Sequence, residues 1–275
     1  MPHCFARRKM TAAKASAHLI RVVTWNIHCG QDDGPPWQRF GWPQRKQALR
    51  AALEPVRPDI LCVQEALPGQ VRFLEQTLPR HERVGVGRDD GHERGEHCAI
   101  FFERTRFERL DGGTFWLQKP IDRPRPGSVF APQRICTWVR LRDRVGGQVV
   151  RVYNCHFALT EGPRRQAARV LLEQIAAGEA ADAVVVTGDF NAPPSALSRR
   201  LFGAAGLIDS GVLAGKRSGL RTFHLYGIPL LSLDGILVGT GTGVDCHLRL
   251  DARAGWHFPS DHFGLLADLS LGQVR

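Results

Sequence analysis

This chain of 275 residues contains no long apolar run. No stretch approaches the roughly 20 apolar residues that a helix needs to cross a bilayer, so the sequence predicts no transmembrane helix. No apolar segment precedes the first strand-like run either, which argues against a secretory signal peptide. Residues 1–18 hold basic residues without a hydrophobic pattern, and we interpret them as a flexible basic N-terminal arm.

Cysteine pairs at metal-binding or redox spacing are also missing. The seven cysteines are an odd number, and no two of them stand in a Cys-x-x-Cys arrangement. Cys62, Cys98, Cys136 and Cys155 fall in strand-like runs, where buried reduced thiols are expected. Because disulfides are rare in the cytoplasm, reduced thiols of this kind favour a cytoplasmic location.

Lysine and tyrosine are scarce, with five Lys and two Tyr in the chain. So few tyrosines offer little for a surface that stacks the bases of single-stranded nucleic acid. The formal net charge is nevertheless +10, which favours an anionic partner such as nucleic acid, a phosphorylated metabolite or a lipid surface. The basic residues are mostly arginines scattered along the chain, so charge alone does not choose among these partners.

The length and the 43% of hydrophobic residues suffice for one large core, and we predict a single domain over residues 19–275. Helical spacing of apolar residues occurs over 42–56 and over 160–177, where Thr160 is the expected cap. Short apolar or alternating segments between turn residues predict strands elsewhere. The loop 118–134, rich in Pro and Arg, is a candidate lid or substrate-facing flap.

The segment VVVTGDFNAPPS, residues 184–195, runs from an apolar strand directly into Asp189 and Asn191. Side chains two residues apart in an extended chain point the same way, so both polar groups would face one point. The alternative is a structural one, in which Asp or Asn caps the next helix or closes a turn.

Several other strand-like segments end in polar side chains in the same way. The full set is Asn26, Glu65, Asn154, His156, Asp189, Asn191, Asp234, Asp261 and His262. Each residue alone is compatible with a surface, core or turn role. Strands of one sheet bring their ends to a common rim, and oxygen ligands there suit Mg²⁺ or Mn²⁺, whereas zinc would call for more Cys and His. Two histidines beside such a metal indicate phosphoester hydrolysis.

The segments TWNIH, VQE, GEHCAIFF, NCHF, TGDFN, LDGILV and SDH resemble, in this order, the motifs of the endonuclease/exonuclease/phosphatase superfamily, the DNase I-like proteins, in its bacterial form. The resemblance covers about residues 20–270. It implies an α/β (α+β) four-layer sandwich, with two mixed β-sheets packed face to face and helices on both outer faces. It also implies a phosphoesterase that uses Mg²⁺ or Mn²⁺.

The resemblance also implies roles for single residues. Glu65 matches the direct metal ligand, Asn26 lies at the neighbouring strand end of the metal site, and Asp261 matches a metal-side carboxylate. Asp189 matches the residue that orients or deprotonates the attacking water, and Asn191 the amide that holds the phosphate.

The two histidines have matches as well. His262, steered by Asp234, matches the histidine that stabilises the charge on pentavalent phosphorus. His156 matches the second active-site histidine, and Asn154, its neighbour, is a predicted substrate contact. In DNase I-like members a glutamate pairs with this second histidine, so we expect a carboxylate oxygen of Glu96 within about 2.6–3.2 Å of a His156 ring nitrogen, or one water away.

Two positions depart from the pattern. Ala158 stands where many bacterial relatives have an aspartate, which puts substrate contacts in question. Gly235 follows Asp234 where a bulky aromatic or polar residue is common, which loosens the wall beside that carboxylate. Arg134 and the segment 222–224 are further candidate phosphate contacts, with a surface arginine and a strand start as the alternative interpretations.

Two classes of function fit these residues. The first is a metal-dependent phosphoester hydrolase, nuclease or phosphatase, in which an activated water attacks phosphorus in line. The second is a catalytically silent fold that binds phosphorylated partners, and loss of Glu65, Asp189 or His262 would indicate it; all three are present. The sequence leaves open whether the substrate is nucleic acid, a small phosphoester or a phospholipid head group, and we expect a monomer.

Overall fold

The computed structural model describes residues 18–30, 41–125, 132–215, 219–255 and 257–271. Most of the predicted N-terminal arm and part of the loop 118–134 lie outside the described residues. Within these ranges, no helix combines the length and the apolar character that crossing a membrane requires. The described cysteines are free thiols, and the four expected to be buried are buried.

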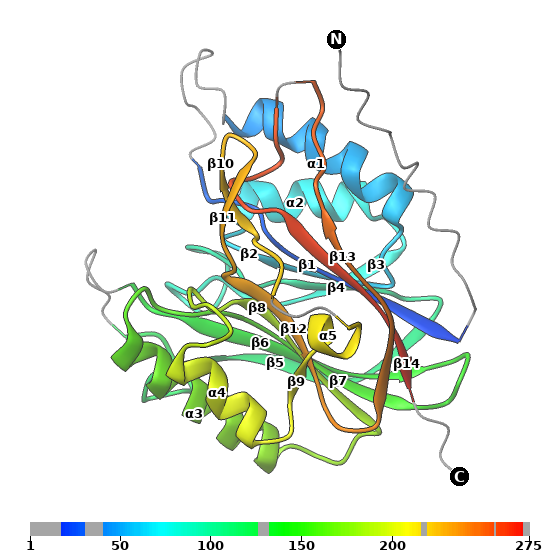
Figure 1. Ribbon diagram of the computed structural model, residues 1–275, viewed down its shortest axis with the longest axis vertical. Helices are drawn as coiled ribbons and strands as arrows, with labels where there is room; N and C mark the ends of the chain where they lie inside the picture. Colours follow the sequence, from blue (N-terminus) through cyan, green and yellow to red (C-terminus); the bar gives the residue numbers. More distant parts are fainter. Residues whose placement is uncertain (1–17, 31–40, 126–131, 216–218, 256, 272–275) are drawn as a thin grey trace.

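The structure is a sandwich of two six-stranded sheets with helices outside, as Figure 1 shows. The first sheet has the order β13-β14-β1-β2-β4-β3 and consists of β1 (Leu19–Asn26), β2 (Ile60–Gln64), β3 (His81–Val84), β4 (Ile100–Glu103), β13 (Thr242–Leu250) and β14 (Gly264–Leu271). The second has the order β5-β6-β7-β8-β12-β9 and consists of β5 (Phe107–Trp116), β6 (Ile135–Asp143), β7 (Val149–His156), β8 (Ala183–Asp189), β9 (Ile208–Asp209) and β12 (Asp234–Val238).

Helices cover both outer faces, so the predicted four-layer sandwich is confirmed. The first sheet carries α1 (Trp42–Val56) and α2 (Pro68–Thr77), and the second carries α3 (Glu161–Ala177) and α4 (Leu197–Ala204) (Figure 1). A short helix, α5 (Ser210–Leu213), contacts β12 and β13, and a separate hairpin is formed by β10 (Phe223–Leu225) and β11 (Ile228–Leu231). Both sheets are mixed, because β1–β2 and β7–β8 are parallel pairs and the other pairs are antiparallel.

Three apolar clusters fill the spaces between the four layers. In β8, Val185 belongs to the cluster between the sheets and Val186 to the cluster under α3 and α4. This division follows from strand geometry, since successive side chains point to opposite faces. The same rule places Val22 between the sheets and Val23 under α1 and α2. Strands that are buried on both faces are mostly apolar along their length, and these segments follow that pattern.

The helix starts differ from the sequence expectation in one detail. Thr160 is the N-cap residue of α3, as predicted, but its side chain makes no capping hydrogen bond. The Glu161 carboxylate instead accepts a hydrogen bond of 2.7 Å from the backbone N–H of Ser198 in the first turn of α4. The first residue of α3 therefore provides the acceptor for a backbone N–H at the start of α4.

Arg106 joins the two sheets at the end opposite the strand-end residues. Its guanidinium donates to Asp59, which precedes β2, at 2.9 Å, and to Asp143, at the end of β6, at 3.0 Å. The Arg106 side chain is 5% exposed, and those of Asp59 and Asp143 are 1% and 3% exposed. Removing one member of such a buried set leaves the remaining charges uncompensated.

We expect Arg106→Ala to lower the free energy of unfolding by about 3–5 kcal/mol, because two buried carboxylates lose their cation. Arg142→Ala is the matched control: Arg142 of β6 pairs with Glu108 of β5, at 3.1 Å, but both side chains are more than 40% exposed. Its loss should cost less than about 1 kcal/mol. Urea unfolding of both variants makes the test, and equal effects would contradict the role given to Arg106.

Candidate active site

Polar side chains from the first sheet meet at one rim of the sandwich. Asn26 is the last residue of β1 and Glu65 directly follows β2, and these strands run parallel. His262 lies just before β14, which pairs antiparallel with β1. Because parallel strands end where an antiparallel neighbour begins, all three side chains come to the same edge.

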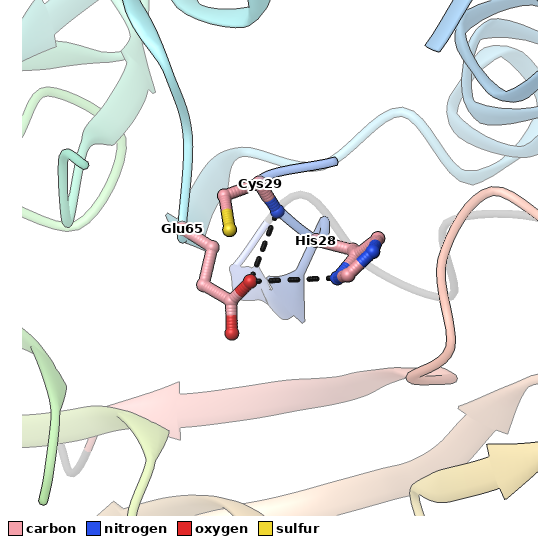
Figure 2. Close-up of side chains that lie close together, drawn as sticks. All are labelled: His28, Cys29 and Glu65. Carbon is pink, nitrogen blue, oxygen red and sulfur yellow. Dashed lines mark hydrogen bonds and ion pairs between the residues drawn. The ribbon is translucent and has the colours of Figure 1, made fainter. Parts of the chain in front are cut away.

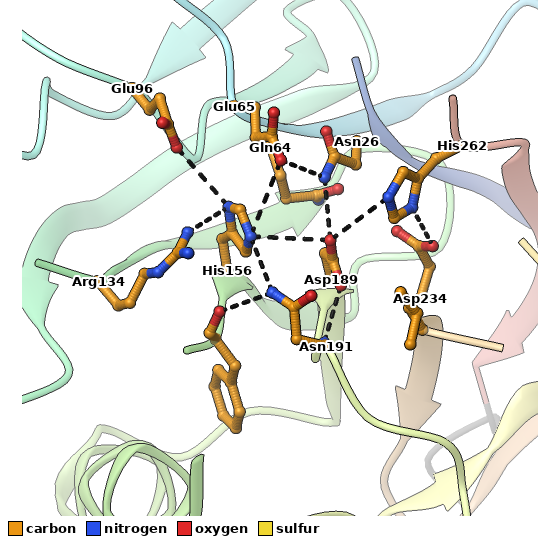
Figure 3. A network of polar contacts seen from close by, with 12 residues as sticks. Asn26, Gln64, Glu65, Glu96, Arg134, His156, Asp189, Asn191, Asp234 and His262 are labelled. Atoms are coloured by element: carbon orange, nitrogen blue, oxygen red, sulfur yellow. Dashed lines mark hydrogen bonds and ion pairs between the residues drawn. The ribbon is translucent and has the colours of Figure 1, made fainter. Parts of the chain in front are cut away.

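The second sheet supplies three more side chains by the same geometry. His156 ends β7 and Asp189 ends the parallel strand β8, with the two residues paired in register. Asp234 begins the antiparallel strand β12 directly opposite Asp189. Figure 3 shows the two sets facing one another, so the strand-end residues of both sheets form one site.

Asn26 links the two sheets within this site. Its amide nitrogen donates to Glu65 Oε1 and to Asp189 Oδ2, at 2.9 Å each, and its oxygen accepts from the backbone N–H of His28 at 3.0 Å. The amide therefore holds two carboxylates together and turns its nitrogen toward them. The role of Asn26 as a metal ligand stays a prediction.

Glu65 is an ionised carboxylate. Burial alone would raise the pKa of Glu65, but the neighbouring His28 and His156 and the hydrogen bond from Asn26 hold it well below its usual range. The backbone N–H of Cys29 also donates to Glu65 Oε2, at 2.9 Å. An anionic oxygen donor at a strand end is thus available at neutral pH.

The pKa of Asp189 is shifted in the opposite direction from that of Glu65. Burial and the nearby Asp234 carboxylate raise the pKa of Asp189 to about 6. Its Oδ1 accepts from the backbone N–H of Asn191 at 2.8 Å, which is a turn within the chain. The next helix begins only at Leu197, so the helix-cap alternative is wrong, and Oδ2 faces the site.

His262 is held by Asp234. Its Nδ1 lies 2.8 Å from Asp234 Oδ2, and its Nε2 lies 3.9 Å from Asp189 Oδ2. Burial would lower the pKa of His262, but the Asp234 and Asp189 carboxylates raise it to about 10. The ring is therefore an imidazolium at neutral pH, as the predicted pairing of these two residues requires.

His156 is neutral by contrast. Arg134 Nη1 lies 2.8 Å from His156 Nδ1, and Asn191 Nδ2 lies 3.1 Å from Nε2, so both ring nitrogens face hydrogen-bond donors. Burial and the Arg134 charge lower the pKa of His156 well below its ordinary value. Arg134 is itself buried, so the surface-arginine alternative for it is wrong.

Glu96 does not make the direct contact that the sequence predicts. Its Oε2 lies 3.8 Å from His156 Nδ1, beyond hydrogen-bond reach, and accepts instead from Arg88 Nη1 at 2.6 Å. The reason is that the Arg134 guanidinium occupies the bonding position on that ring nitrogen. Glu96 still lies on the same side of the site as His156 (Figure 3), and its side chain is only 16% exposed.

Asn154 was expected to contact substrate, and the structure gives it a different place. The residue is fully buried, and its amide nitrogen donates to the backbone oxygens of Val63 and Ala99 at 2.9 and 3.0 Å. Its oxygen accepts from Gln64 Nε2 at 2.6 Å. These bonds join the two sheets beneath the site. Asn154 therefore has a structural role in place of the predicted substrate contact.

The segment 222–224 is also structural. Thr222 Oγ1 accepts from the backbone N–H groups of Leu233 and Asp234, at 3.2 Å each, which orients the start of β12. His224 is buried with its ring 4.0 Å, centroid to centroid, from that of Phe263. Neither side chain is placed as the phosphate contact that the sequence suggested.

The departure at Gly235 has a physical counterpart in α4. A Cβ at this position would lie 2.6 Å from Arg199 Nη2, so the missing side chain makes room for the guanidinium. Arg199 is buried, lies 4.1 Å from the Phe190 ring centroid and donates to Asp209 at 3.0 Å. The wall beside Asp234 is therefore filled from a neighbouring helix.

Asp261 lies at the outer edge of the site. Its side chain is 36% exposed, and its Oδ2 lies 3.8 Å from His28 Nδ1. Sequence reasoning missed His28 and Cys29, which lie beside Glu65 (Figure 2), although they stand only two and three residues after Asn26. Their position just after the end of β1 was the sequence feature that could have indicated them.

Comparison with known proteins identifies this arrangement. A model of the Endonuclease/Exonuclease/phosphatase family matches residues 23–262. The chain belongs to this family. The family is one of phosphoester hydrolases, so the coarse chemical class predicted from the strand ends agrees with it.

Individual relatives match nearly the full length of this chain. The uncharacterized protein YbhP of Escherichia coli is 27% identical over 268 residues, which is 92% of this chain and 96% of that protein. An endonuclease/exonuclease/phosphatase from Bacteroides vulgatus has a TM-score of 0.81 at 30% identity and covers 92% of this chain and 99% of that one. A mannosyl-6-phosphatase of Bacteroides thetaiotaomicron has a TM-score of 0.79 at 27% identity, with coverages of 91% and 99%. By contrast, the chain spans only 18% of the mimivirus protein R895, which is 28% identical over 125 residues.

In metal-free protein we expect His262 to stay protonated until the pH approaches about 10, because Asp234 stabilises the imidazolium. Stability from this pair is then full below the ordinary pKa of 6.5 and is lost as the pH rises toward 10. In Asp234→Asn the pKa of His262 should fall from this value, since the hydrogen bond and the charge of Asp234 are lost while burial still lowers the pKa. Histidine NMR titration measures both values, with Glu108→Gln as the exposed control; an unchanged His262 titration in Asp234→Asn would refute the assignment.

Proposed function

We propose that this protein is a metal-dependent phosphoester hydrolase in which a water assisted by Asp189 attacks phosphorus in line. The observation that carries the proposal is the placement of two histidine rings around one buried carboxylate. The Nε2 atoms of His156 and His262 both lie within 4 Å of Asp189 Oδ2, and their surroundings raise the pKa of His262 and lower the pKa of His156. Groups whose pKa values are driven apart in one site are typical of acid–base catalysis.

The donor set fits a hard divalent cation. Donor atoms of Glu65, His156 and Asp189 lie within 4.8 Å of one another, and Glu65 is ionised. Carboxylates with few other protein ligands suit Mg²⁺ or Mn²⁺, which keep several waters. Glu65 would hold the ion, with Asn26 and Asp261 as the further predicted metal-side residues. Such an ion polarises a phosphoryl oxygen and makes a bound water more acidic.

The protein's own groups have distinct tasks in this proposal. Asp189, with a pKa of about 6, is largely ionised at neutral pH and accepts the proton of the attacking water. His262, oriented by Asp234, donates from Nε2 to the charge that develops on the phosphoryl oxygens. Asn191 and His156 hold the phosphate, and Arg134 adds a buried positive charge behind His156.

For the substrate we favour a phosphate monoester of a small molecule such as a sugar. A relative with 27% identity and a TM-score of 0.79 is a mannosyl-6-phosphatase by its description. The net charge of +10 is the observation that keeps nucleic acid as the second candidate. Retention of Glu65, Asp189 and His262 in bonded positions argues against a silent scaffold. The free thiols of the described residues support our further proposal of a cytoplasmic location, and we also propose that the protein is a monomer.

Activity should require added Mg²⁺ or Mn²⁺ and disappear in excess chelator, because a cation-stabilised phosphoryl oxygen is part of the reaction. The measurement is phosphate or nucleotide release from a panel of sugar phosphates, inositol phosphates, phospholipids, DNA and RNA. Full turnover of any of these substrates in excess chelator would exclude the metal-dependent mechanism.

Asp189→Asn should lower kcat by about 10² or more, because it removes the base and keeps the shape of the side chain. Asp182→Asn is the matched control, since Asp182 precedes the same strand, β8, and its side chain accepts from the backbone N–H of Val149, at 2.7 Å, away from the site. Thermal melting checks that both variants fold. Near wild-type turnover in folded Asp189→Asn would show that Asp189 is only a turn residue.

A further inference from the structure

A buried arginine lies behind the two carboxylates that the second sheet brings to the site. Asp189 ends β8 and Asp234 begins β12, and the two residues are paired in register. Their side chains are 2% and 1% exposed, and Figure 3 shows both facing the site. The Oδ1 atom of Asp234 is buried and has no hydrogen-bond partner among the described residues. Two neighbouring carboxylates buried in this way repel one another and need positive charge nearby.

Two glycines make room for such a charge on the other face of the sheet. Gly188 and Gly235 are the neighbouring pair in the same register. Because successive residues of a strand point to opposite faces, Gly235 belongs to the face that α3 and α4 cover, as does Leu237. A Cβ at Gly235 would lie 2.6 Å from Arg199 Nη2, and one at Gly188 would lie 2.1 Å from the backbone oxygen of Cys155. The guanidinium of Arg199 therefore packs against bare backbone.

Arg199 is held in this space by contacts on two sides. Its side chain is 3% exposed, Nη2 donates to Asp209 Oδ2 at 3.0 Å, and the guanidinium carbon lies 4.1 Å from the Phe190 ring centroid. The Nη1 atom is buried and has no hydrogen-bond partner among the residues that the structure describes. Burial lowers the pKa of this side chain, and the carboxylates of Asp209, Asp234 and Asp189 oppose that shift. One cation thus interacts with an ion-pair partner and, across the sheet, with both carboxylates of the site.

We propose that Arg199 is a positioning residue, whose charge holds Asp189 and Asp234 in place from the helix side of the second sheet. The guanidinium attracts both carboxylates and offsets their mutual repulsion without occupying space in the site. Asp234 in turn orients the His262 ring, and Asp189 keeps its Oδ2 atom toward Asn26. The effect of Arg199 on turnover rests on the proposed hydrolase function, whereas its effect on the position of Asp234 does not.

The kinetic test separates loss of the charge from loss of the ion pair. Arg199→Met removes the charge and keeps an extended side chain; it should lower kcat by about 10–100-fold, as for other residues that orient a functional group, with little change in KM. Arg199→Lys keeps the charge and should recover most of the lost kcat. The assay is phosphate release from mannose 6-phosphate with added Mg²⁺.

Asp209→Asn is the matched control for a purely structural role of the ion pair. It removes the charged partner of Arg199, leaves the cation in place and keeps a side chain that can accept the capping hydrogen bond from Gly211 in α5. We expect this variant to retain the wild-type kcat. A loss equal to that of Arg199→Met would show that the ion pair, and not the charge behind the carboxylates, is what matters.

Proton NMR gives a readout that needs no turnover. The Nδ1 proton of His262 lies in a 2.8 Å hydrogen bond to Asp234 and should give a downfield resonance, assigned by its loss in His262→Asn. Its chemical shift should change in Arg199→Met, return toward the wild-type value in Arg199→Lys and stay the same in Asp209→Asn. If Arg199→Met does not fold, Gly235→Ala makes the same test, because the added Cβ displaces the guanidinium.

The two readouts distinguish failure of this inference from failure of the proposed function. An unchanged resonance in the folded Arg199→Met or Gly235→Ala variant would overturn the inference, and so would an Arg199→Lys variant as impaired as Arg199→Met. A wild-type protein that releases no phosphate, but whose resonance follows the charge at position 199, would count against the proposed function and would support the positioning role.

Discussion

The Asn26 amide, which donates to Glu65 and Asp189 at the same time, is the contact on which the site depends. It brings a carboxylate from each sheet to one point at the rim. Like charges repel, and burial penalises them further, so both carboxylates need donors in fixed positions. Beneath Asn26, the bond from Gln64 to Asn154 and the bonds from Asn154 to the first sheet keep the two sheets in register. These polar contacts between the sheets therefore support the chemistry at the rim.

From this constraint follows a division of charge among similar groups. Glu65 is anionic because cationic and N–H groups surround it, and Asp189 has a raised pKa because it is buried beside Asp234. The two histidines differ for the same kind of reason: a carboxylate bonds His262, whereas an arginine bonds His156. The two carboxylates therefore differ from one another in pKa, and so do the two imidazoles, because their neighbours differ.

Glu65 directs its two oxygens to different partners, since Oε1 accepts from Asn26 and Oε2 from the backbone N–H of Cys29. Both oxygens are thereby held in place at the end of β2. At the other wall of the site, Arg199 of α4 fills the space that Gly235 leaves open. A departure from the expected pattern at this wall is therefore compensated by a side chain of a neighbouring helix.

The strand ends, the two histidines and the four-layer fold could be predicted from the sequence because apolar runs and their limits are local properties of the chain. The resemblance predicted the pairing of His262 with Asp234, but the partners of several other side chains could not be predicted. Arg134 reaches His156 from 22 residues away and displaces Glu96, Asn154 turns into the space between the sheets, and Cys29 approaches Glu65 across 36 residues. Each outcome depends on which side chain arrives within about 3 Å of a given atom, and only the packing of the whole chain sets such distances. The sequence by itself determined which groups stand at the rim, and the tertiary structure decided which of them carry a proton.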